Sequence, residues 1–222
     1  MHKLAAVLLV VSAVIAGTLS LQGLAQPAAT APAASAPASD VVIKGVSTMP
    51  VTFDGNVSKF EYADAACASF PNGHGIVDVS AKCFDGYLYF AFQIPDLSPH
   101  PGDDIVIMLD TDHSRHAAPG KTDIRAYVRR NMENSRMQQG DGQKWADYYG
   151  DWEYRSALYS TGREVEARIP LKSLGIEPGK KAALGLAFRI WDNKPQQTYN
   201  WPAGSNENKP DTWGTLTIDL TE

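Results

Sequence analysis

Several tryptophans of this sequence fall in polar, glycine- and asparagine-rich segments, where core packing explains them poorly. Trp201 begins the loop-like segment 201–212, and Trp145 and Trp152 lie in the segment 140–156, GDGQKWADYYGDWEYRS. A flat ring left near water suits a ligand with flat apolar faces, and a sugar presents such C–H faces while its hydroxyl groups form hydrogen bonds. These tryptophans therefore predict a carbohydrate-binding surface. The alternative is a loop that folds its ring into the core.

Polar side chains that could hold the hydroxyl groups of a sugar surround Trp201 in the sequence. They are Asp192, Asn193, Gln197, Tyr199 and Asn200. Carboxylates and amides together supply the acceptors and donors that hydroxyl groups need. Asp192, Asn193 and Asn200 are accordingly expected to contact a ligand beside Trp201, which we predict to be a surface platform and not a core residue.

Aspartates bracket the apolar segment 103–112, GDDIVIMLDTDHS in its context. Asp103 and Asp104 precede the run, and Asp110 and Asp112 follow it. Calcium takes several hard oxygen ligands, commonly carboxylates from a turning segment. We predict a structural calcium ion at Asp110 and Asp112, with Asp103 and Asp104 as further candidates. Capping of turns by aspartate explains the same residues without a metal.

Catalytic motifs are absent from the sequence, which contains no Gly-x-Ser-x-Gly, no His-Glu-x-x-His and no phosphate-binding glycine loop. The histidines after the first residues fall in predicted loops, which is typical of solvated side chains: His74, His100, His113 and His116. Glu164 and Glu166 alternate on one predicted strand and are interpreted as solvated. A binding protein is expected, and a glycoside hydrolase with a pair of carboxylates stays open as an alternative.

The elements that must position these residues are short strands. An Asp-Gly turn at 85–86 joins two alternating runs and predicts a hairpin. Helix is expected only at 58–66 and 171–175. The pattern predicts an all-β, antiparallel β-sandwich of the immunoglobulin or jelly-roll type. Its predicted strands are 41–46, 75–84, 87–96, 103–110, 123–131, 152–160, 163–171, 182–192 and 213–220.

The first 40 residues have the composition of segments that lie outside a fold. Residues 1–25 combine a basic start, an apolar run and a small-x-small end, which predicts a cleaved signal peptide, with an uncleaved membrane anchor as the alternative. Residues 26–40 are rich in Ala and Pro and predict a linker. One domain is expected at 41–222, in a secreted or periplasmic protein.

The charge and the cysteine content limit the partners and the chemistry that the sequence predicts. The net charge of −5 argues against nucleic acid or an anionic membrane as partner once the signal is removed. In an exported chain, the isolated pair Cys67 and Cys83 predicts one disulfide. We expect a monomer, and no redox or zinc chemistry, because the cysteines do not form a Cys-x-x-Cys motif.

A set of segments in a fixed order resembles the family 9 carbohydrate-binding modules and their wider sandwich relatives. The segments are FDGNVSKFEYADAA, AKCFDGYLYFAFQIPD, DDIVIMLDTDHS, GREVEARIPLKSLGIEPGKKAALGLAFRIWDN and WGTLTIDL. The resemblance implies a calcium-containing β-sandwich that holds the end of a sugar chain between two tryptophans, as in modules attached to xylanases. It matches Trp201 to the final-loop tryptophan, Asp110 and Asp112 to an acidic strand end, and Arg130 and Asn131 to a polar strand.

The sequence departs from the family pattern in two places. Val106 stands where the family often has an acid in the middle of a strand. The first tryptophan of the clamp has several candidates here: Tyr87, Tyr89, Trp145 and Trp152. The expected ligand is a xylan- or cellulose-type glycan used in carbohydrate catabolism.

A related group with a DOMON-like sandwich offers an alternative, a periplasmic haem-binding or protein-interaction module. Haem iron needs axial ligands such as His or Met. In this sequence Met108, Met132 and Met137 are the candidate ligands.

Overall fold

A computed structural model describes residues 39–131 and 133–221 of the chain. The predicted signal peptide, 1–25, and nearly all of the predicted linker, 26–40, lie outside the described residues. The described part contains the following elements: β1 (Asp40–Lys44), β2 (Ala66–Pro71), β3 (Ile76–Phe84), β4 (Tyr87–Pro95), β5 (Asp104–Asp110), β6 (Asp123–Arg129), β7 (Arg136–Gly140), β8 (Trp145–Tyr148), β9 (Glu153–Tyr159), β10 (Gly162–Pro170), η1 (Leu171–Leu174), β11 (Lys181–Asp192), β12 (Gln197–Trp201), η2 (Pro210–Thr212) and β13 (Gly214–Asp219).

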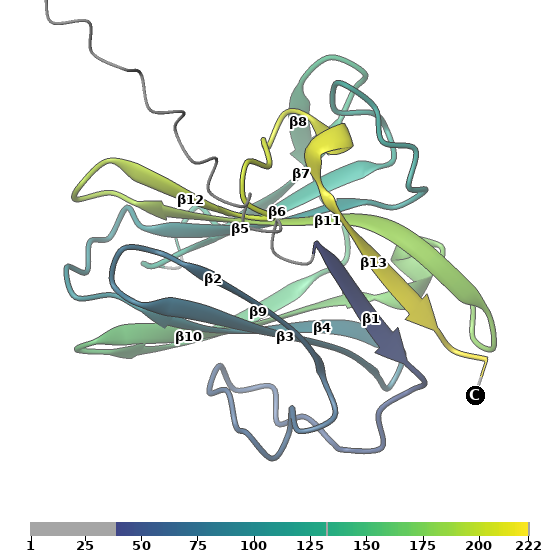
Figure 1. Ribbon diagram of the computed structural model, residues 1–222, viewed down its shortest axis with the longest axis horizontal. Coiled ribbons are helices and arrows are strands. Elements are labelled where there is room, and N and C mark those ends of the chain that lie inside the picture. Colours follow the sequence, from purple (N-terminus) through teal and green to yellow (C-terminus); the bar gives the residue numbers. More distant parts are fainter. Residues whose placement is uncertain (1–38, 132, 222) are drawn as a thin grey trace, which may run out of the picture. The chain divides into compact units, whose positions relative to one another are not determined.

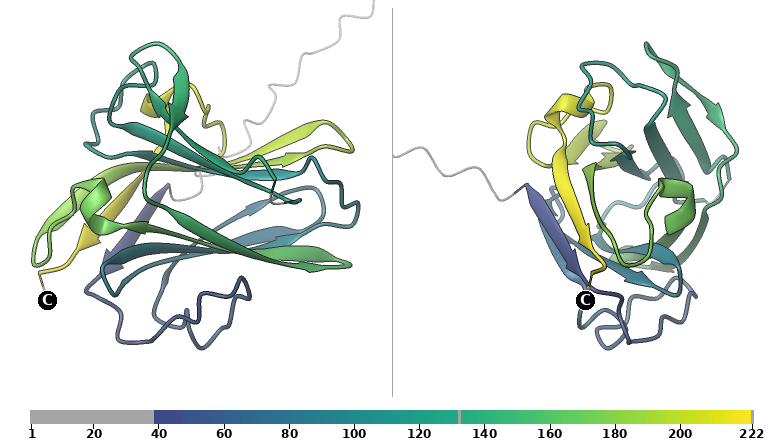
Figure 2. Two further views of the ribbon diagram at one scale, coloured as in Figure 1. Left: turned by 180° about the vertical axis from the view of Figure 1, so that it is seen from behind. Right: turned by 90° about the vertical axis from the view of Figure 1, so that its right-hand side faces the viewer.

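These strands form two sheets that lie one over the other (Figure 1 and Figure 2). The larger sheet has the order β1-β13-β11-β5-β6-β7-β8, and β12 also pairs with β11. The smaller sheet has the order β2-β3-β4-β10-β9. Neighbouring strands are antiparallel, except that β1 runs parallel to β13. The predicted all-β sandwich is therefore confirmed.

The hairpin of β3 and β4 shows how the sequence directs this pairing. Asp85 and Gly86 join the two strands with φ values of 45° and 78°. Both values lie in the left-handed region that a tight hairpin turn requires, and an Asp-Gly pair accepts them at low cost. The turn fixes the register, so that Phe84 lies opposite Tyr87 and the alternate side chains of both strands share a face.

Apolar side chains from the facing surfaces of the two sheets form the core. Phe188 of β11 contacts Phe90 and Phe92 of β4, with ring centroids 5.7 and 5.3 Å apart. Trp201 of β12 lies opposite Phe188 in the register, and their ring centroids are 5.5 Å apart. Edge-to-face and tilted contacts of this kind contribute beyond the area that they bury.

Of the two expected helices, one forms and the other does not. The segment at 171–175 forms the short helix η1, which ends at Gly175 with a φ of 69°. The segment at 58–66 forms turns, and this part of the prediction is wrong. The physical reason is that only the Tyr62 N–H bonds four residues back, to Ser58, while the N–H groups of Ala63 and Ala65 bond three residues back, so no regular α-helical pattern continues.

Glu166 anchors the preceding part of the same segment, and its interpretation as a solvated residue is wrong. Its carboxylate is fully buried and accepts hydrogen bonds from the N–H groups of Asp54 and Gly55 and from the Tyr62 hydroxyl, at 2.9, 2.8 and 2.6 Å. Burial raises the pKa of Glu166, while these donors lower it. The segment therefore covers part of the outer face of the smaller sheet, as Figure 1 shows for the chain below β3 and β10.

The predicted disulfide is absent, and both cysteines are free thiols. Cys67 of β2 lies opposite Ser80 of β3, whereas Cys83 is three residues further along β3 and points to the core. Alternate residues of a strand face opposite sides of a sheet, so the two sulfur atoms lie on opposite faces. Cys83 is fully buried, and this burial raises the pKa of its thiol to about 12. Among the described residues, no helix is long and apolar enough to cross a membrane.

Candidate functional site

The outer face of the larger sheet carries polar side chains in straight rows that run across neighbouring strands. One row joins five strands through residues that lie directly opposite one another: Asn200 of β12, Arg189 of β11, Val106 of β5, Tyr127 of β6 and Arg136 of β7. Residues opposite one another in a sheet point to the same face. Their neighbours Phe188, Ile107 and Ala126 point inward to the core, so this row points outward.

A second row runs parallel to the first, two residues further along each strand. It contains Ala187, Met108, Arg125, Gln138 and Asp147. The two rows place guanidinium, amide and carboxylate groups around a small apolar floor.

The floor is a separate apolar cluster on this outer face. It consists of Val106, Met108, Tyr127, Ala187 and Trp213, with Trp145 packed against it. The rings of Trp145 and Trp213 are stacked, with centroids 6.5 Å apart and planes 8° apart. The first five of these residues are buried, and Trp145 is the half-buried ring at the edge of the cluster, where a ligand with apolar faces could contact it.

Guanidinium groups lie over these rings. The Cζ atom of Arg125 is 4.4 Å from the ring centroid of Trp145 and 5.1 Å from that of Tyr127. Arg189 and Arg136 both lie 5.5 Å from the Tyr127 ring. A planar guanidinium stacks on an aromatic face and still directs its N–H groups outward in the plane. We call Arg125, Tyr127, Arg129, Gln138, Trp145, Arg189, Glu207 and Trp213 the outer-face layer.

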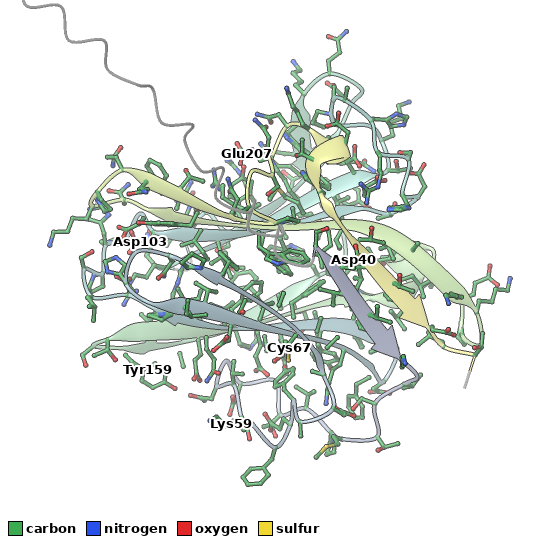
Figure 3. The ribbon with its side chains drawn as sticks, in the orientation of Figure 1. Asp40, Lys59, Cys67, Asp103, Tyr159 and Glu207 are labelled. Atoms are coloured by element: carbon green, nitrogen blue, oxygen red, sulfur yellow. The ribbon has the colours of Figure 1, made fainter. Side chains whose placement is uncertain are left out.

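A loop from the C-terminal region closes over one side of this layer. Glu207 lies near two guanidinium groups: Oε1 is 3.6 Å from Nη1 of Arg125, and Oε2 is 3.0 Å from Nη1 of Arg189. Asn208 Oδ1 accepts a hydrogen bond from Trp145 Nε1 at 2.9 Å. Figure 3 shows Glu207 on the outer side of the larger sheet, and Figure 1 shows its loop standing above the strands near β8.

Several buried polar atoms of the layer make no hydrogen bond. They are Nη1 of Arg125, Nε of Arg129, Nε of Arg189 and Oε2 of Glu207. The other nitrogens of Arg125, Nε and Nη2, both donate to Oε1 of Gln138, at 2.9 and 2.7 Å. Burial lowers the pKa of Arg125. Buried donors without partners are rare because each costs about 1–3 kcal/mol, so a cluster of them on one face indicates a place for an external polar partner.

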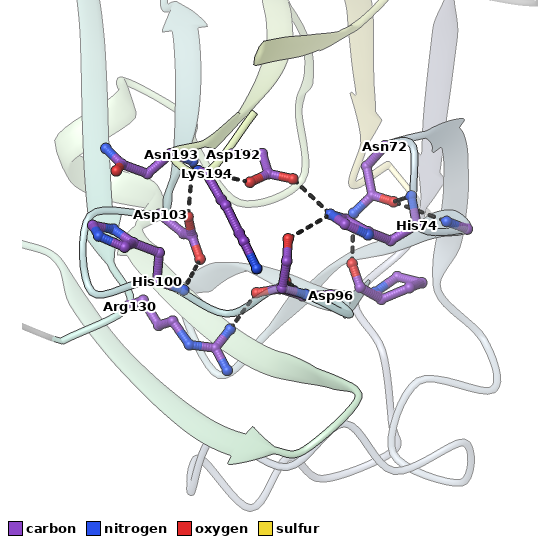
Figure 4. Close-up of polar contacts among 12 residues, drawn as sticks. Asn72, His74, Asp96, His100, Asp103, Arg130, Asp192, Asn193 and Lys194 are labelled. Atoms are coloured by element: carbon purple, nitrogen blue, oxygen red, sulfur yellow. Dashed lines mark hydrogen bonds and ion pairs between the residues drawn. The ribbon is translucent and has the colours of Figure 1, made fainter. Parts of the chain in front are cut away.

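A second polar cluster, which we call the end network, lies at one end of the sandwich (Figure 4). It brings together the predicted residues Asp103, Arg130, Asp192 and Asn193 with His74 and Asp96. Arg130 Nη1 donates to Asp96 Oδ2 at 2.6 Å, and His74 Nε2 lies 2.6 Å from Asp192 Oδ2. Asp103 accepts hydrogen bonds from the N–H groups of His100 and Asn193 at 2.7 and 2.9 Å.

The end network uses its polar groups to join loops to one another. Asp192 Oδ1 also accepts from the N–H of Lys194, and the Asn72 amide donates to the carbonyl oxygen of Pro95 at 2.7 Å. The small hollow beside it, of about 10 Å³, has room for about one water molecule. Arg163 lines this hollow, and burial lowers its pKa to about 10. We assign the end network to stability, because its pairs are already complete, apart from Nη1 of Arg163.

The remaining predicted ligand residues fall in different places. Trp201 is 3% exposed and belongs to the core, so its prediction as a surface platform is wrong. The reason is that 197–201 forms β12, whose register turns Trp201 inward and Asn200 outward beside Arg189. Trp152 stacks on Tyr154 at 4.8 Å against the core. Asn131 lines a shallow apolar hollow with Pro99, His100, Pro101, Arg130 and Leu158.

Of the predicted ligand set, only Trp145 and Asn200 lie on the outer face of the larger sheet near Arg189. Sequence reasoning missed Arg125, Arg189, Gln138 and Glu207. A signal for the first of these existed in the segment 123–129, DIRAYVR, where Arg125, Tyr127 and Arg129 alternate with apolar residues. Two-residue alternation places all three on one face, opposite the core.

The predicted calcium residues are divided between the two ends of β5. Asp103 belongs to the end network, and Asp104 pairs with Arg189 at 2.9 Å, whereas Asp110 lies at the far end of the strand. A strand of seven residues is about 20 Å long, so these pairs cannot share one ion.

The carboxylates of Asp110 and Asp112 are partly occupied by protein donors. Asp110 accepts from the N–H groups of Ser114 and Arg115, and Asp112 accepts from the Thr122 hydroxyl at 3.0 Å. Within the part of the chain that the structure describes, no group of three or more His, Cys, Asp or Glu side chains could hold a metal ion. The Oδ1 atom of buried Asp123, opposite Asp110, has no hydrogen-bond partner. The residues present do not form a closed calcium site, and calcium stays a prediction.

The candidate haem ligands do not converge. Met108 lies on the outer face of the larger sheet, and Met137 lies in the core on the inner face. Met132 lies outside the described residues. Two axial ligands must approach one iron from opposite sides, and Met108 and Met137 are separated by the sheet itself.

Comparisons with known proteins agree with this architecture. A search of curated proteins finds no significant match. Among solved structures, two forms of a family 9 carbohydrate-binding module from Caldicellulosiruptor kristjanssonii are similar. The complex with cellotriose shares 16% identity and a TM-score of 0.57, over 81% of this chain and 93% of that chain. The complex with glucose shares 18% identity and a TM-score of 0.58, over 81% and 95%.

At this level of identity the two structures establish the fold alone. The family model described as "Carbohydrate family 9 binding domain-like" matches residues 85–220, which is more than half of the chain. The matched range includes β5, β6, β11 and the loop that carries Glu207, and therefore all of the outer-face layer. The chain belongs to the carbohydrate family 9 binding domain-like family.

Proposed function

We propose that this protein binds an oligo- or polysaccharide of the xylan or cellulose type through the outer-face layer. The observation that carries the proposal is the cluster of buried guanidinium nitrogens without a hydrogen bond around the stacked rings of Trp145 and Trp213. The apolar face of a sugar ring would lie against the half-buried ring of Trp145. Its hydroxyl groups would accept from Arg125 Nη1 and Arg189 Nε and so supply the missing partners.

Family membership and the fold support this proposal. The similar solved modules are described in complex with cellotriose and with glucose. The end network is a weaker candidate for the sugar site, because its hydrogen bonds are already made and its hollow accommodates no more than about one water molecule.

A pair of tryptophan variants tests the proposal directly. Trp145→Ala removes the half-buried ring of the outer-face layer, and Trp152→Ala removes a half-buried ring that packs elsewhere, on Tyr154. Aromatic anchors dominate binding energy, so Trp145→Ala should weaken binding by about 2 kcal/mol, or roughly thirtyfold. Trp152→Ala should leave the affinity of the folded protein unchanged.

Isothermal titration of xylo- and cello-oligosaccharides into each variant measures both affinities, and circular dichroism confirms that each variant is folded. Equal losses in the two variants, or a loss confined to Trp152→Ala, would place the sugar elsewhere. Failure of the wild-type protein to bind any oligosaccharide would contradict the function itself.

Export is part of the proposed function. The basic start, apolar run and small-x-small end of residues 1–25 support signal cleavage, and residues 26–40 would then tether the domain. Mass spectrometry of protein recovered from the periplasm or medium should give a mass that lacks the first 25 residues. A full-length mass in the membrane fraction would favour the uncleaved anchor.

A further inference from the structure

Four arginines meet on the outer face of the larger sheet in a protein whose net charge is −5. Arg125 and Arg129 come from β6, Arg136 from β7 and Arg189 from β11. Nη1 of Arg125, Nε of Arg129 and Nε of Arg189 are buried and make no hydrogen bond, and the nearest carboxylate oxygens of the first two lie at 3.6 and 3.9 Å. A concentration of one charge sign on one face sets a local potential that differs from that of the whole molecule.

Glu207 is the carboxylate that occupies the space between two of these guanidinium groups. Its distances of 3.6 Å to Arg125 and 3.0 Å to Arg189 are those of ion pairs, yet its Oε2 atom makes no well-formed hydrogen bond. A guanidinium group binds a carboxylate best through two parallel N–H···O bonds. The Glu207 carboxylate therefore lies beside both guanidinium groups without forming the two parallel hydrogen bonds that a guanidinium group can donate.

The position of Glu207 in the chain allows its side chain to leave. It lies in the loop between β12 and η2. Hydrogen bonds of Asn206 with Trp213 and of Asn208 with Trp145 hold the loop on both sides, so that only the Glu207 side chain need move. Its side chain is 27% exposed, while those of Arg125 and Arg189 are 10% and 17% exposed. A ligand carboxylate that paired with these arginines would replace one ion pair by another, and the released Glu207 would regain water.

We propose that the outer-face layer selects glycans that contain uronic acid residues and so carry a carboxylate. When no ligand is bound, Glu207 occupies the position that the ligand carboxylate would take. The inference rests on the proposed function and specifies the ligand class of the same surface. A uronic acid supplies what a neutral sugar lacks: two acceptor oxygens in one plane, matched to the N–H groups of Arg125 and Arg189. Xylan-type chains with glucuronic acid branches belong to this class.

The test compares one ligand in three forms. A xylo-oligosaccharide that carries a single glucuronic acid is titrated into the full chain, alongside the same oligosaccharide without the acid and its glucuronic acid methyl ester. The acidic form should bind at least about tenfold more tightly than either neutral form at low salt. The difference should shrink as salt is raised, because partly exposed ion pairs are screened.

Two variants make the assignment specific to the layer. Glu207→Gln removes the competing carboxylate and should raise the ratio of the affinity for the acidic form to the affinity for the neutral forms. Arg189→Gln should remove most of the preference for the acidic form, and Arg189→Lys should restore part of it, because the charge returns without the paired N–H geometry. Thermal melts identify any variant that fails to fold, and Glu207→Gln keeps the test valid if Arg189→Gln does not fold.

The outcomes separate the two proposals. Equal binding of the acidic and neutral oligosaccharides, or a preference that Glu207→Gln and Arg189→Gln both leave intact, would overturn the inference and leave carbohydrate binding in place. Absence of binding to all three forms would contradict the proposed function as well.

Discussion

The end network and the outer-face layer are both rich in arginine and carboxylate groups, but they differ in how completely those groups are paired. In the end network, Arg130 and Asp96 lie 2.6 Å apart, and Asp103 and Asp192 each accept hydrogen bonds from two other residues. In the outer-face layer, three arginines and Glu207 each have a buried atom without a hydrogen bond, whereas in the end network Nη1 of Arg163 is the one such atom among the described residues. Polar composition alone does not distinguish the two regions. The pairing does, and it assigns stability to one and binding to the other.

The largest expected effect belongs to the core residue Trp201, which lies outside both regions. Trp201→Ala should lower the free energy of unfolding by about 3–5 kcal/mol, because it removes a buried ring that packs on Phe188. Glycan affinity of the remaining folded protein should not change. Chemical denaturation and titration of the same sample measure both. A variant that keeps its stability and loses its affinity would return Trp201 to the role of a surface platform.

Breaking the end network should have the next largest effect. Arg130→Ala leaves Asp96 buried without its cation and should cost about 3 kcal/mol of unfolding free energy. Because we assign this network to stability, glycan affinity should be retained. A denaturation curve close to that of the wild type, together with lost affinity, would reverse the assignment of the two regions.

Strand register in the smaller sheet predicts the state of the cysteines. Cys67 and Cys83 point to opposite faces of the smaller sheet, so the protein, unfolded without reductant, should show two free thiols. Cys67→Ser should change the unfolding free energy by less than about 0.5 kcal/mol, because Cys67 is exposed. Detection of no free thiol would show that the strand register of β2 and β3 is wrong.

The smallest effect is expected at the Asp110 end of β5, beyond the outer-face layer. If calcium binds at Asp110 and Asp112, added calcium should raise Tm by mass action and a chelator should lower it. We expect the shift to be small, since Ser114, Arg115 and Thr122 already donate to these carboxylates. Differential scanning calorimetry with and without chelator measures it, and Asp112→Ala is the matched variant in which any calcium-dependent shift should vanish.

Turn chemistry and strand alternation were enough to predict the sandwich. Asp85-Gly86 specifies a hairpin locally, and the alternation of 75–84 and 87–96 specifies which side chains point to the core. Trp201 was misplaced because Pro202 and Gly204 made its surroundings read as a surface loop. The pairing of β12 with β11, which turns the ring inward, depends on a contact between separate strands that the local sequence does not encode.

The candidate site shows the same limit. Alternation within 123–129 is sufficient to place Arg125, Tyr127 and Arg129 on one face. It cannot show that Arg189 and Glu207, at least 60 residues away, meet them there, because the order β11-β5-β6 is a property of the whole sheet. Nor can a sequence show which polar groups are left without partners, and that difference is what separates the binding surface from the end network.

Indole N–H signals in a nuclear magnetic resonance titration test the central claim most directly, since the chain has only five tryptophans. Uniformly ¹⁵N-labelled protein is titrated with a xylo- or cello-oligosaccharide, and the signals are assigned with single Trp→Phe variants. Binding at the outer-face layer predicts that the signals of Trp145 and Trp213 move, while those of Trp152 and Trp201 stay in place. Movement of the Trp152 or Trp201 signal with Trp145 unchanged would contradict the account.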